Sequence, residues 1–256
     1  FTSLGDSKTP LYFLIGSSIG NIILDLIFVI QFQMGVAGVA WATFLAQGVS
    51  CLLSLAALLR RIRGIPTEGQ VPVFSMRMLG KISRVAIPSI LQQSFISVGN
   101  IFIQVLVNGF GSATIAGYSA AVKLNTFAIT SFTTLANGVS NFTAQNIGAG
   151  KEERVKQGFK SGIFMMLCVV LPFFVFYFFF DKPALSLFME ESSSVAIKVG
   201  TDFLRIVAPF YFVVSVKLLA DGVLRGAGAM KQFMVTTFSD LLLRVVLAFV
   251  FAGIWG

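Results

Sequence analysis

Polar side chains that fall inside long apolar segments are the residues of this sequence most able to do chemistry. Asp25 lies in the first such segment, and Asn21 lies one helical turn before it on the same face. Thr43, on the returning segment, is about as far from the intervening turn as Asp25. A carboxylate, an amide and a hydroxyl at one level offer hard oxygen ligands for Na⁺, and burial favours a protonated carboxylate. The same groups could instead hydrogen-bond to one another and only hold two helices together, and the spacing leaves both interpretations open.

Two further apolar segments carry polar stripes. Between residues 93 and 108, and again between 119 and 141, polar side chains recur every three or four residues. Such a stripe faces either a water-filled cavity or a neighbouring helix, and small hydroxyls are common where helices touch in membranes. Lys123 favours the cavity because it lies about ten residues inside its segment, too deep for its ammonium to reach the surface easily.

Charges at intervals of four mark the last two segments. Lys217, Asp221 and Arg225 have this spacing, as do Asp240 and Arg244. Ion pairing along each helix would neutralise the acids. The alternative is a second protonation site or a gate, since charges inside a membrane are costly and mark functional positions. The candidate cavity-lining residues are Gln93, Asn100, Gln104, Lys123, Thr130, Asn137, Lys217 and Asp221.

The composition places all these residues in a membrane. Hydrophobic residues make up 56% of the 256 residues and charged residues only 12%, against about 25% charged in a typical soluble domain. A bilayer is crossed by about 20 apolar residues, which must be helical because unpaired backbone groups are too costly in hydrocarbon. We therefore predict an all-α, polytopic membrane helix bundle with seven transmembrane helices, at roughly 10–34, 36–60, 84–108, 113–146, 158–180, 200–224 and 232–255. The aromatic-rich stretch Pro172–Phe180 is expected to face lipid.

The basic residues predict the topology. Thirteen Lys and Arg residues lie in or beside alternate connections, whereas the other connections hold two, Lys182 and Lys198. The excess of basic residues marks the cytoplasmic side of a multi-pass protein in the cell (inner) membrane. The cytoplasmic loops are then 1–9, 61–83, 147–157 and 225–231. This pattern accounts for the net charge of +8, and without a basic groove interleaved with aromatics we expect no nucleic-acid partner.

The residue inventory argues against an enzyme. The sequence has no histidine, and its two cysteines, Cys51 and Cys168, lie in apolar segments, where we expect buried free thiols. A Cys/His zinc site and His-dependent nucleophilic catalysis are therefore excluded. We predict no catalytic residues and no cofactor.

The segment 61–83 is the longest polar connection. It contains two prolines and two glycines, Pro66, Pro72, Gly64 and Gly69, which disfavour regular structure. We predict a linker between two lobes on the cytoplasmic side, with a short amphipathic helix starting at Ser75.

Four motifs together resemble the MATE (multidrug and toxic compound extrusion) family. They are Gly5–Pro10 (GDSKTP), Gln92–Ser94, Ser131–Gly150 and Leu224–Gly226, and they span nearly the whole chain in the family's order. Members have twelve helices in two six-helix lobes. The resemblance implies that 1–60 holds the last two helices of the amino-terminal lobe, that 61–83 is the inter-lobe linker and that 84–256 holds five helices of the carboxyl-terminal lobe. Four helices would precede this fragment and one would follow it.

The resemblance also implies a cation-coupling site. In the DinF-like branch, coupling uses an Asp on the fifth helix, an Asn one turn before it and a Thr on the sixth helix, and Asp25, Asn21 and Thr43 match these positions. The NorM-like branch places its acids in the carboxyl-terminal lobe. Where that branch has a Glu on its seventh helix, this chain has Ile96, and the tenth-helix acid is also missing, although Asp221 lies nearby. The expected coupling site is therefore in the amino-terminal lobe.

The implied function is a secondary active antiporter that exports cationic or amphipathic organic compounds in exchange for H⁺ or Na⁺. It would work in the lipid bilayer as a monomer. A lipid or polysaccharide flippase of related architecture is the alternative, and it would need a cationic groove that Lys123, Lys217 and Arg244 could supply. A seven-helix receptor also fits the helix count, but truncation explains that count more simply.

Overall fold

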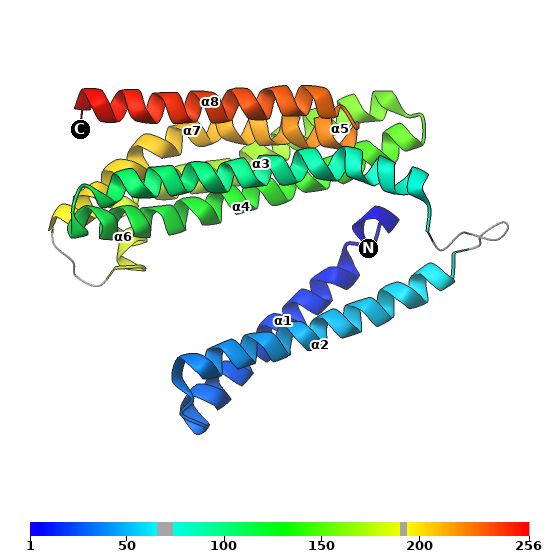
Figure 1. Cartoon of the computed structure of the whole chain (residues 1–256), viewed down its shortest axis with the longest axis horizontal. Coiled ribbons are helices and arrows are strands. Elements are labelled where there is room, and N and C mark those ends of the chain that lie inside the picture. Colours follow the sequence, from blue (N-terminus) through cyan, green and yellow to red (C-terminus); the bar gives the residue numbers. More distant parts are fainter. Residues whose placement is uncertain (66–73, 190–193, 256) are drawn as a thin grey trace. The chain divides into compact units, whose positions relative to one another are not determined.

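The computed structural model describes residues 1–65, 74–189 and 194–255, and these residues fold almost entirely into helices (Figure 1). After a 3₁₀ turn at Thr2–Leu4, the chain forms α1 (Lys8–Leu26) with a π-helical extension η2 (Ile27–Gln31), α2 (Gly35–Arg63), α3 (Met76–Asn108), α4 (Ser112–Gly148), α5 (Glu152–Phe179), the short α6 (Asp181–Ser186), α7 (Ser194–Gly226) and α8 (Met230–Trp255). The described residues contain no strand. The all-α prediction is confirmed, and each predicted segment coincides with one long helix.

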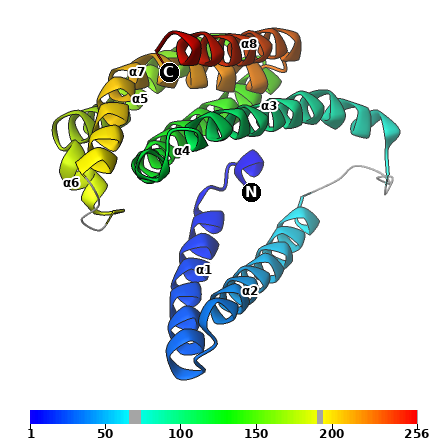
Figure 2. The ribbon, with the colours of Figure 1, turned by 60° about the vertical axis from the view of Figure 1, so that its left-hand side comes forward.

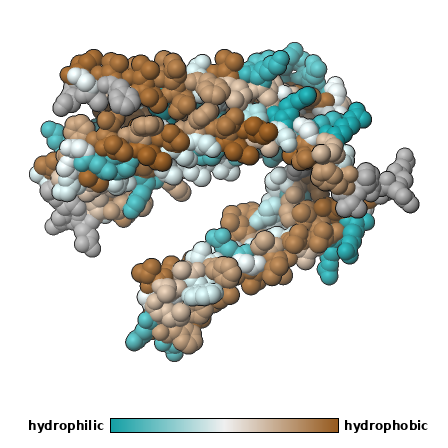
Figure 3. Space-filling view, viewed as in Figure 1, coloured by the Kyte–Doolittle hydropathy of each residue, from teal (hydrophilic) through white to brown (hydrophobic). Residues whose placement is uncertain are grey.

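The helices have the properties of a membrane bundle. In the described part of the chain, five helical stretches are long and apolar enough to cross a membrane: Lys8–Gln31, α2, α3, α5 and α7. Their large apolar side chains point outward, as shown by Leu14, Val36 and Phe164, which are 63%, 88% and 70% exposed. Apolar residues cover much of the visible surface in Figure 3. Exposure on this scale is suited to lipid rather than water.

The chain divides into two compact units, Phe1–Phe74 and Ser75–Gly256. The division falls inside the predicted linker 61–83, of which residues 66–73 lie outside the described residues. The helix expected from Ser75 is present but is not a separate element, because α3 continues from it without interruption. The Ser75 hydroxyl accepts a hydrogen bond from the Met78 N–H at 3.4 Å, which caps the first turn, and no proline follows until Pro88.

The first unit is a hairpin of α1 and α2, which run in opposite directions from a tight turn (Figure 2). Two hydrogen bonds between a hydroxyl and a backbone carbonyl define their register. Ser17 donates to the Ala46 carbonyl, and Ser50 donates to the Phe13 carbonyl, each at 3.4 Å. Facing positions therefore have residue numbers that add up to about 63.

The second unit is built around α4, which packs most extensively against α7, while α5 packs against both. The backbones of α4 and α7 touch at glycines. A Cβ atom added to Gly117 would lie 2.1 Å from the Ala196 carbonyl oxygen, and one added to Gly222 would lie 2.5 Å from the Ala136 carbonyl oxygen. The contact further along α4, at Ala136, is also further along α7, at Gly222, so the two helices are parallel. Small residues permit this approach, as is common between helices in membranes.

The aromatic stretch Pro172–Phe180 on α5 does not simply face lipid. Tyr177 is only 1% exposed, and its hydroxyl donates to the Leu124 carbonyl at 2.9 Å. Its ring packs against those of Phe173 and Tyr211, with centroids 5.7 and 6.2 Å apart. The expectation is wrong for this side of the helix, because a stretch that is apolar on all faces shows no periodicity from which a core-facing side could be chosen.

Candidate functional site

The α1–α2 hairpin brings two of the three predicted coupling residues together. The Asn21 side-chain amide donates to the Thr43 hydroxyl at 3.3 Å, and both side chains are half-buried. Their residue numbers add up to 64, so this contact belongs to the same register as the two serine hydrogen bonds.

Asp25 lies one turn away from this pair. Four residues of helix separate it from Asn21 by about 6 Å along the axis. The register places it opposite Val39, so the three groups do not share one level, contrary to expectation. The π-helical segment η2 explains this difference. A π-helix has more residues in each turn than an α-helix, so the chain from α1 to the turn rises less per residue than the chain of α2.

The Asp25 carboxylate is incompletely satisfied. Its side chain is half-buried, and its Oδ1 atom is inaccessible and has no hydrogen-bond partner among the described residues. A buried polar atom in this condition is costly unless it gains a proton, a cation or a donor from elsewhere. The carboxylate of Asp25, the amide oxygen of Asn21 and the hydroxyl of Thr43 are oxygen ligands of the kind that Na⁺ accepts.

A polar recess of about 420 Å³ lies between α1 and α2 and reaches Asn21. Ser17, Ser18, Ser50 and Ser54 supply hydroxyls to its lining, so it extends from Asn21 toward the basic end of the hairpin. The cysteines are free, as expected, but the expectation that they are buried is wrong. Cys51 is exposed in this recess, and Cys168 is exposed on α5.

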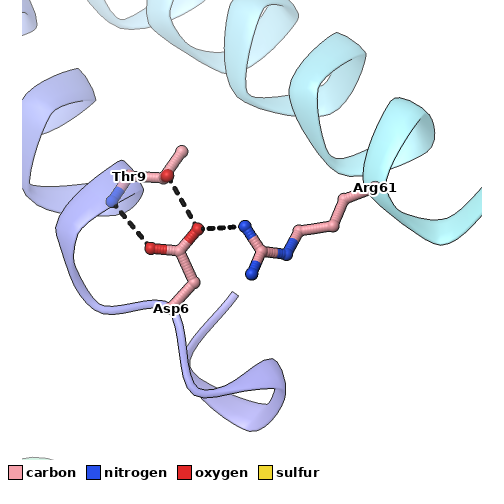
Figure 4. A network of polar contacts seen from close by, with 3 residues as sticks. All are labelled: Asp6, Thr9 and Arg61. Atoms are coloured by element: carbon pink, nitrogen blue, oxygen red, sulfur yellow. Dashed lines mark hydrogen bonds and ion pairs between the residues drawn. The ribbon is translucent and has the colours of Figure 1, made fainter. Parts of the chain in front are cut away.

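A second polar cluster lies at the basic end of the hairpin, inside the GDSKTP motif (Figure 4). Asp6 Oδ1 accepts from the Thr9 backbone N–H at 3.1 Å, and Oδ2 accepts from the Thr9 hydroxyl and from Arg61 Nη1, both at 2.7 Å. The bonds from Thr9, supported by the Arg61 charge, hold the pKa of Asp6 below its usual value. Asp6 thus caps α1 and ties it to the last turn of α2. The sequence held a signal for this contact. Asp6 lies just before α1, and basic residues end α2, the antiparallel neighbour of α1.

In the second unit, Lys217 joins two acids. Its Nζ lies 2.9 Å from Asp240 Oδ2 on α8 and 3.6 Å from Asp221 Oδ2 on its own helix. The side chain of Asp221 is 5% exposed and that of Asp240 is 56% exposed. The intrahelical interpretation therefore holds for Lys217 and Asp221, but Asp240 pairs across to α7.

Two arginines bind amides on neighbouring helices. Arg225 on α7 donates to Asn137 Oδ1 on α4 at 2.9 Å, and Arg244 on α8 donates to Asn100 Oδ1 on α3 at 2.8 Å. These predicted cavity-lining amides are therefore engaged in contacts between helices. Spacing within one helix carries no information about such partners.

The other predicted cavity-lining residues stand apart from this network. Gln104 donates to Asn108 one turn along the same helix at 3.0 Å. The side chains of Gln93, Lys123 and Thr130 are exposed and make no hydrogen bond to one another. The structure thus gathers Lys217, Asn100 and Asn137 into interhelical contacts, keeps Asp221 beside Lys217 within α7, and leaves Gln93, Lys123 and Thr130 on the surface.

Known proteins with similar sequences are transporters. The family model MatE matches residues 88–250. The chain is 30% identical to the probable multidrug resistance protein YpnP of Bacillus subtilis, over 91% of this chain and 52% of that protein. It is 22% identical to the multidrug export protein MepA of Staphylococcus saprophyticus, over 99% of this chain and 56% of that protein. The chain therefore spans about half the length of these curated relatives.

The fold has solved counterparts as well. A structure of a variant of the Vibrio cholerae MATE transporter VcmN superimposes with a TM-score of 0.87 at 20% identity, over 99% of this chain and 57% of that one. At this identity the likeness concerns the fold alone.

Proposed function

Because the chain belongs to the MatE family of transporters, we propose that the protein exports cationic or amphipathic organic compounds in exchange for H⁺ or Na⁺. The family is one of transporters and not of enzymes. The relatives named as multidrug resistance and multidrug export proteins support the class of substrate. The predicted lobes remain part of this proposal, with 1–60 in one lobe, 84–256 in the other and 61–83 as linker, as does function as a monomer.

The buried Asp25 Oδ1, which lacks a partner among the described residues, is the observation that carries the coupling proposal. An unpaired charge deep in a membrane costs about 2.5–3.5 kcal/mol on the insertion scale. Binding of H⁺ or Na⁺ at Asp25 removes that cost. Asn21 and Thr43, which are hydrogen-bonded to each other one turn away, would supply the further oxygen ligands, on the side of Asp25 that faces the recess.

The hydroxyl-lined recess supports a polar path to this site. Its serines connect the level of Asn21 with the basic end of the hairpin, which the distribution of Lys and Arg assigns to the cytoplasm. In the proposed orientation, loops 1–9, 61–83, 147–157 and 225–231 are cytoplasmic. A cation released from Asp25 would leave by this recess.

The transport cycle follows from competition between cation and substrate. An organic compound enters a cavity from the cytoplasm, and the lobes rock to open outward. H⁺ or Na⁺ then binds at Asp25 and favours release of the compound. Each ligand must weaken the other by the same factor, because coupling free energy is reciprocal.

Dye efflux from everted vesicles that hold the full-length protein tests this proposal, with pH and Na⁺ gradients imposed separately. Asp25→Asn should abolish gradient-driven efflux and leave the amount of folded protein unchanged. Asp202→Asn is the matched control, because Asp202 is an exposed acid on α7. Unchanged efflux in Asp25→Asn would make Asp25 a packing residue.

A lipid or polysaccharide flippase remains the alternative function. It would need a cationic groove, but Lys217 is paired with Asp240 and Arg244 is bound to Asn100. Of the three cations expected to supply that groove, only Lys123 is exposed without such a contact to the residues that the structure describes. Absence of gradient-driven efflux for every cationic dye would favour the flippase.

A further inference from the structure

A groove of about 550 Å³ lies between α4 and α5, and its α4 side belongs to the Ser131–Gly150 motif. Its lining includes Gly138 on α4 and Gly158 and Gly162 on α5. The two α5 glycines pack closely against side chains of α4, since an added Cβ would lie 2.3 Å from the Phe142 ring or 3.1 Å from Val139. A Cβ atom added to Gly138 would meet nothing within 4 Å, so this part of the groove is empty space. Except for Arg154, Gln157 and Ser161, the lining is apolar or glycine.

The groove runs from the edge of the predicted membrane span into one leaflet of a bilayer. Its lining on α5 runs from Arg154 in the first turn to Met165, eleven residues later. At 1.5 Å per residue this distance is about 16 Å, and half of a hydrocarbon core of about 30 Å is about 15 Å. Because the predicted span begins at residue 158, about 10 Å of this length lies in the hydrocarbon, and an acyl chain that enters beside Arg154 would follow the groove through much of one leaflet.

Arg154 is the one charged residue among the described residues that line this groove, and it lies in the first turn of α5. Arg154 has no ion pair within the described part of the chain, whereas the neighbouring Glu153 is neutralised by Lys156 at 3.0 Å. A cation in the first turn of a helix is repelled by the positive end of the helix dipole, so Arg154 does not stabilise α5 in this way. A guanidinium is well suited to a phosphate group, which it binds through two parallel hydrogen bonds.

We propose that the α4–α5 groove binds one anionic phospholipid, with its phosphate on Arg154 and one acyl chain along the glycine-lined wall. Basic pockets between transmembrane helices bind acidic headgroups in this manner. The positive charge of Arg154 disfavours the cationic compounds of the proposed transport function. The test below measures lipid binding and does not depend on that function.

Native mass spectrometry of the full-length protein in detergent tests the site, with dioleoyl-phosphatidylglycerol and dioleoyl-phosphatidylcholine added at equal concentration. We expect one phosphatidylglycerol molecule to remain bound in preference to phosphatidylcholine. Arg154→Gln should weaken phosphatidylglycerol roughly tenfold and abolish the preference, since a charge-assisted contact is lost. Gly138→Phe should displace both lipids, because the Cβ position is free of neighbours within 4 Å and the added ring would occupy the groove.

Two variants serve as matched controls. Arg77→Gln removes an exposed arginine from the first turn of α3, and Gly80→Phe adds a ring at an exposed helical glycine whose Cβ position is also free of neighbours. Both should leave lipid binding unchanged. The proposal would be overturned if a variant and its control lost lipid equally, or if the two lipids bound equally. It would also be overturned if no lipid were retained, which would mean that another part of the protein fills the groove. Full displacement of the lipid by inorganic phosphate would reduce the site to a simple anion site and overturn it as well.

Discussion

Replacing Lys217 with Met should destabilise the second unit more than replacing any exposed lysine. Met keeps the aliphatic length of the side chain and removes only the charge that faces Asp221 and Asp240. Asp221 is 5% exposed, and its Oδ2 has no hydrogen bond among the described residues, so Lys217 is its nearest compensation. Leaving a buried charge without its partner costs about 3–5 kcal/mol. Asp240, which is 56% exposed, should contribute about 1 kcal/mol or less.

Thermal unfolding in detergent, followed by circular dichroism, measures this loss. At roughly 2–4 °C per kcal/mol for a chain of this size, Lys217→Met should melt about 6–20 °C below the parent. Asp240→Asn should melt within a few degrees of it. Lys123→Met is the matched control, because Lys123 is exposed on α4, and surface substitutions usually change stability by less than about 0.5 kcal/mol.

The double variant Lys217→Met/Asp221→Asn decides the cause. If the cost comes from the stranded carboxylate, neutralising Asp221 should restore more than half of the lost stability. If the double variant melts no higher than Lys217→Met, the effect is a packing defect and the electrostatic reasoning is wrong.

Three further outcomes are expected. Gly222→Leu should cost about 3 kcal/mol or more, since overpacking against backbone exceeds the usual 1–3 kcal/mol, whereas Gly138→Leu should be tolerated. Equal melting temperatures would contradict the close contact between α4 and α7. Because the pKa of Asp6 is lowered, its stabilisation is present above 3.8, the usual value, and is lost as pH falls toward the folded-state value, so Asp6→Asn should lower the melting temperature at pH 7 but not in strong acid. If the melting temperatures still differ in strong acid, the effect of Asp6→Asn has a cause other than the carboxylate charge. Tyr211→Phe should cost about 1 kcal/mol in thermal unfolding by removing its hydrogen bond to Asn125, and an unchanged value would show that the bond contributes nothing.

Apolar length and charge asymmetry were sufficient to predict the seven long helices of the described residues and the hairpin of the first unit. The contact between Asn21 and Thr43 was also predictable, because two antiparallel helices joined by a short turn have few possible registers. The displacement of Asp25 from that level was not predictable. It depends on the π-helical turn at Ile27–Gln31, whose sequence is as apolar as the helix before it.

The contacts of the second unit were harder to predict, because they join residues far apart in the chain. The spacing of Asp240 and Arg244 suits an ion pair within one helix, but α8 lies where Lys217 and Asn100 are closer partners. Similarly, the ion pair of Asp181 with Arg205 joins α6 to α7 and had no local signal in the sequence. Helix packing determines these choices, and helix packing follows from shape rather than from spacing.

The parallel pairing of α4 with α7 has a consequence for synthesis of the chain. α4 does not reach the apolarity of the five candidate spans, and Asn137 on it finds its arginine only on α7. The end of α7 leaves the ribosome about 80 residues after the end of α4, which takes roughly 4–16 s at 5–20 residues per second. During that interval α4 must be held by the insertion machinery or by α5, so slowing translation between the two helices should increase degradation of the nascent protein.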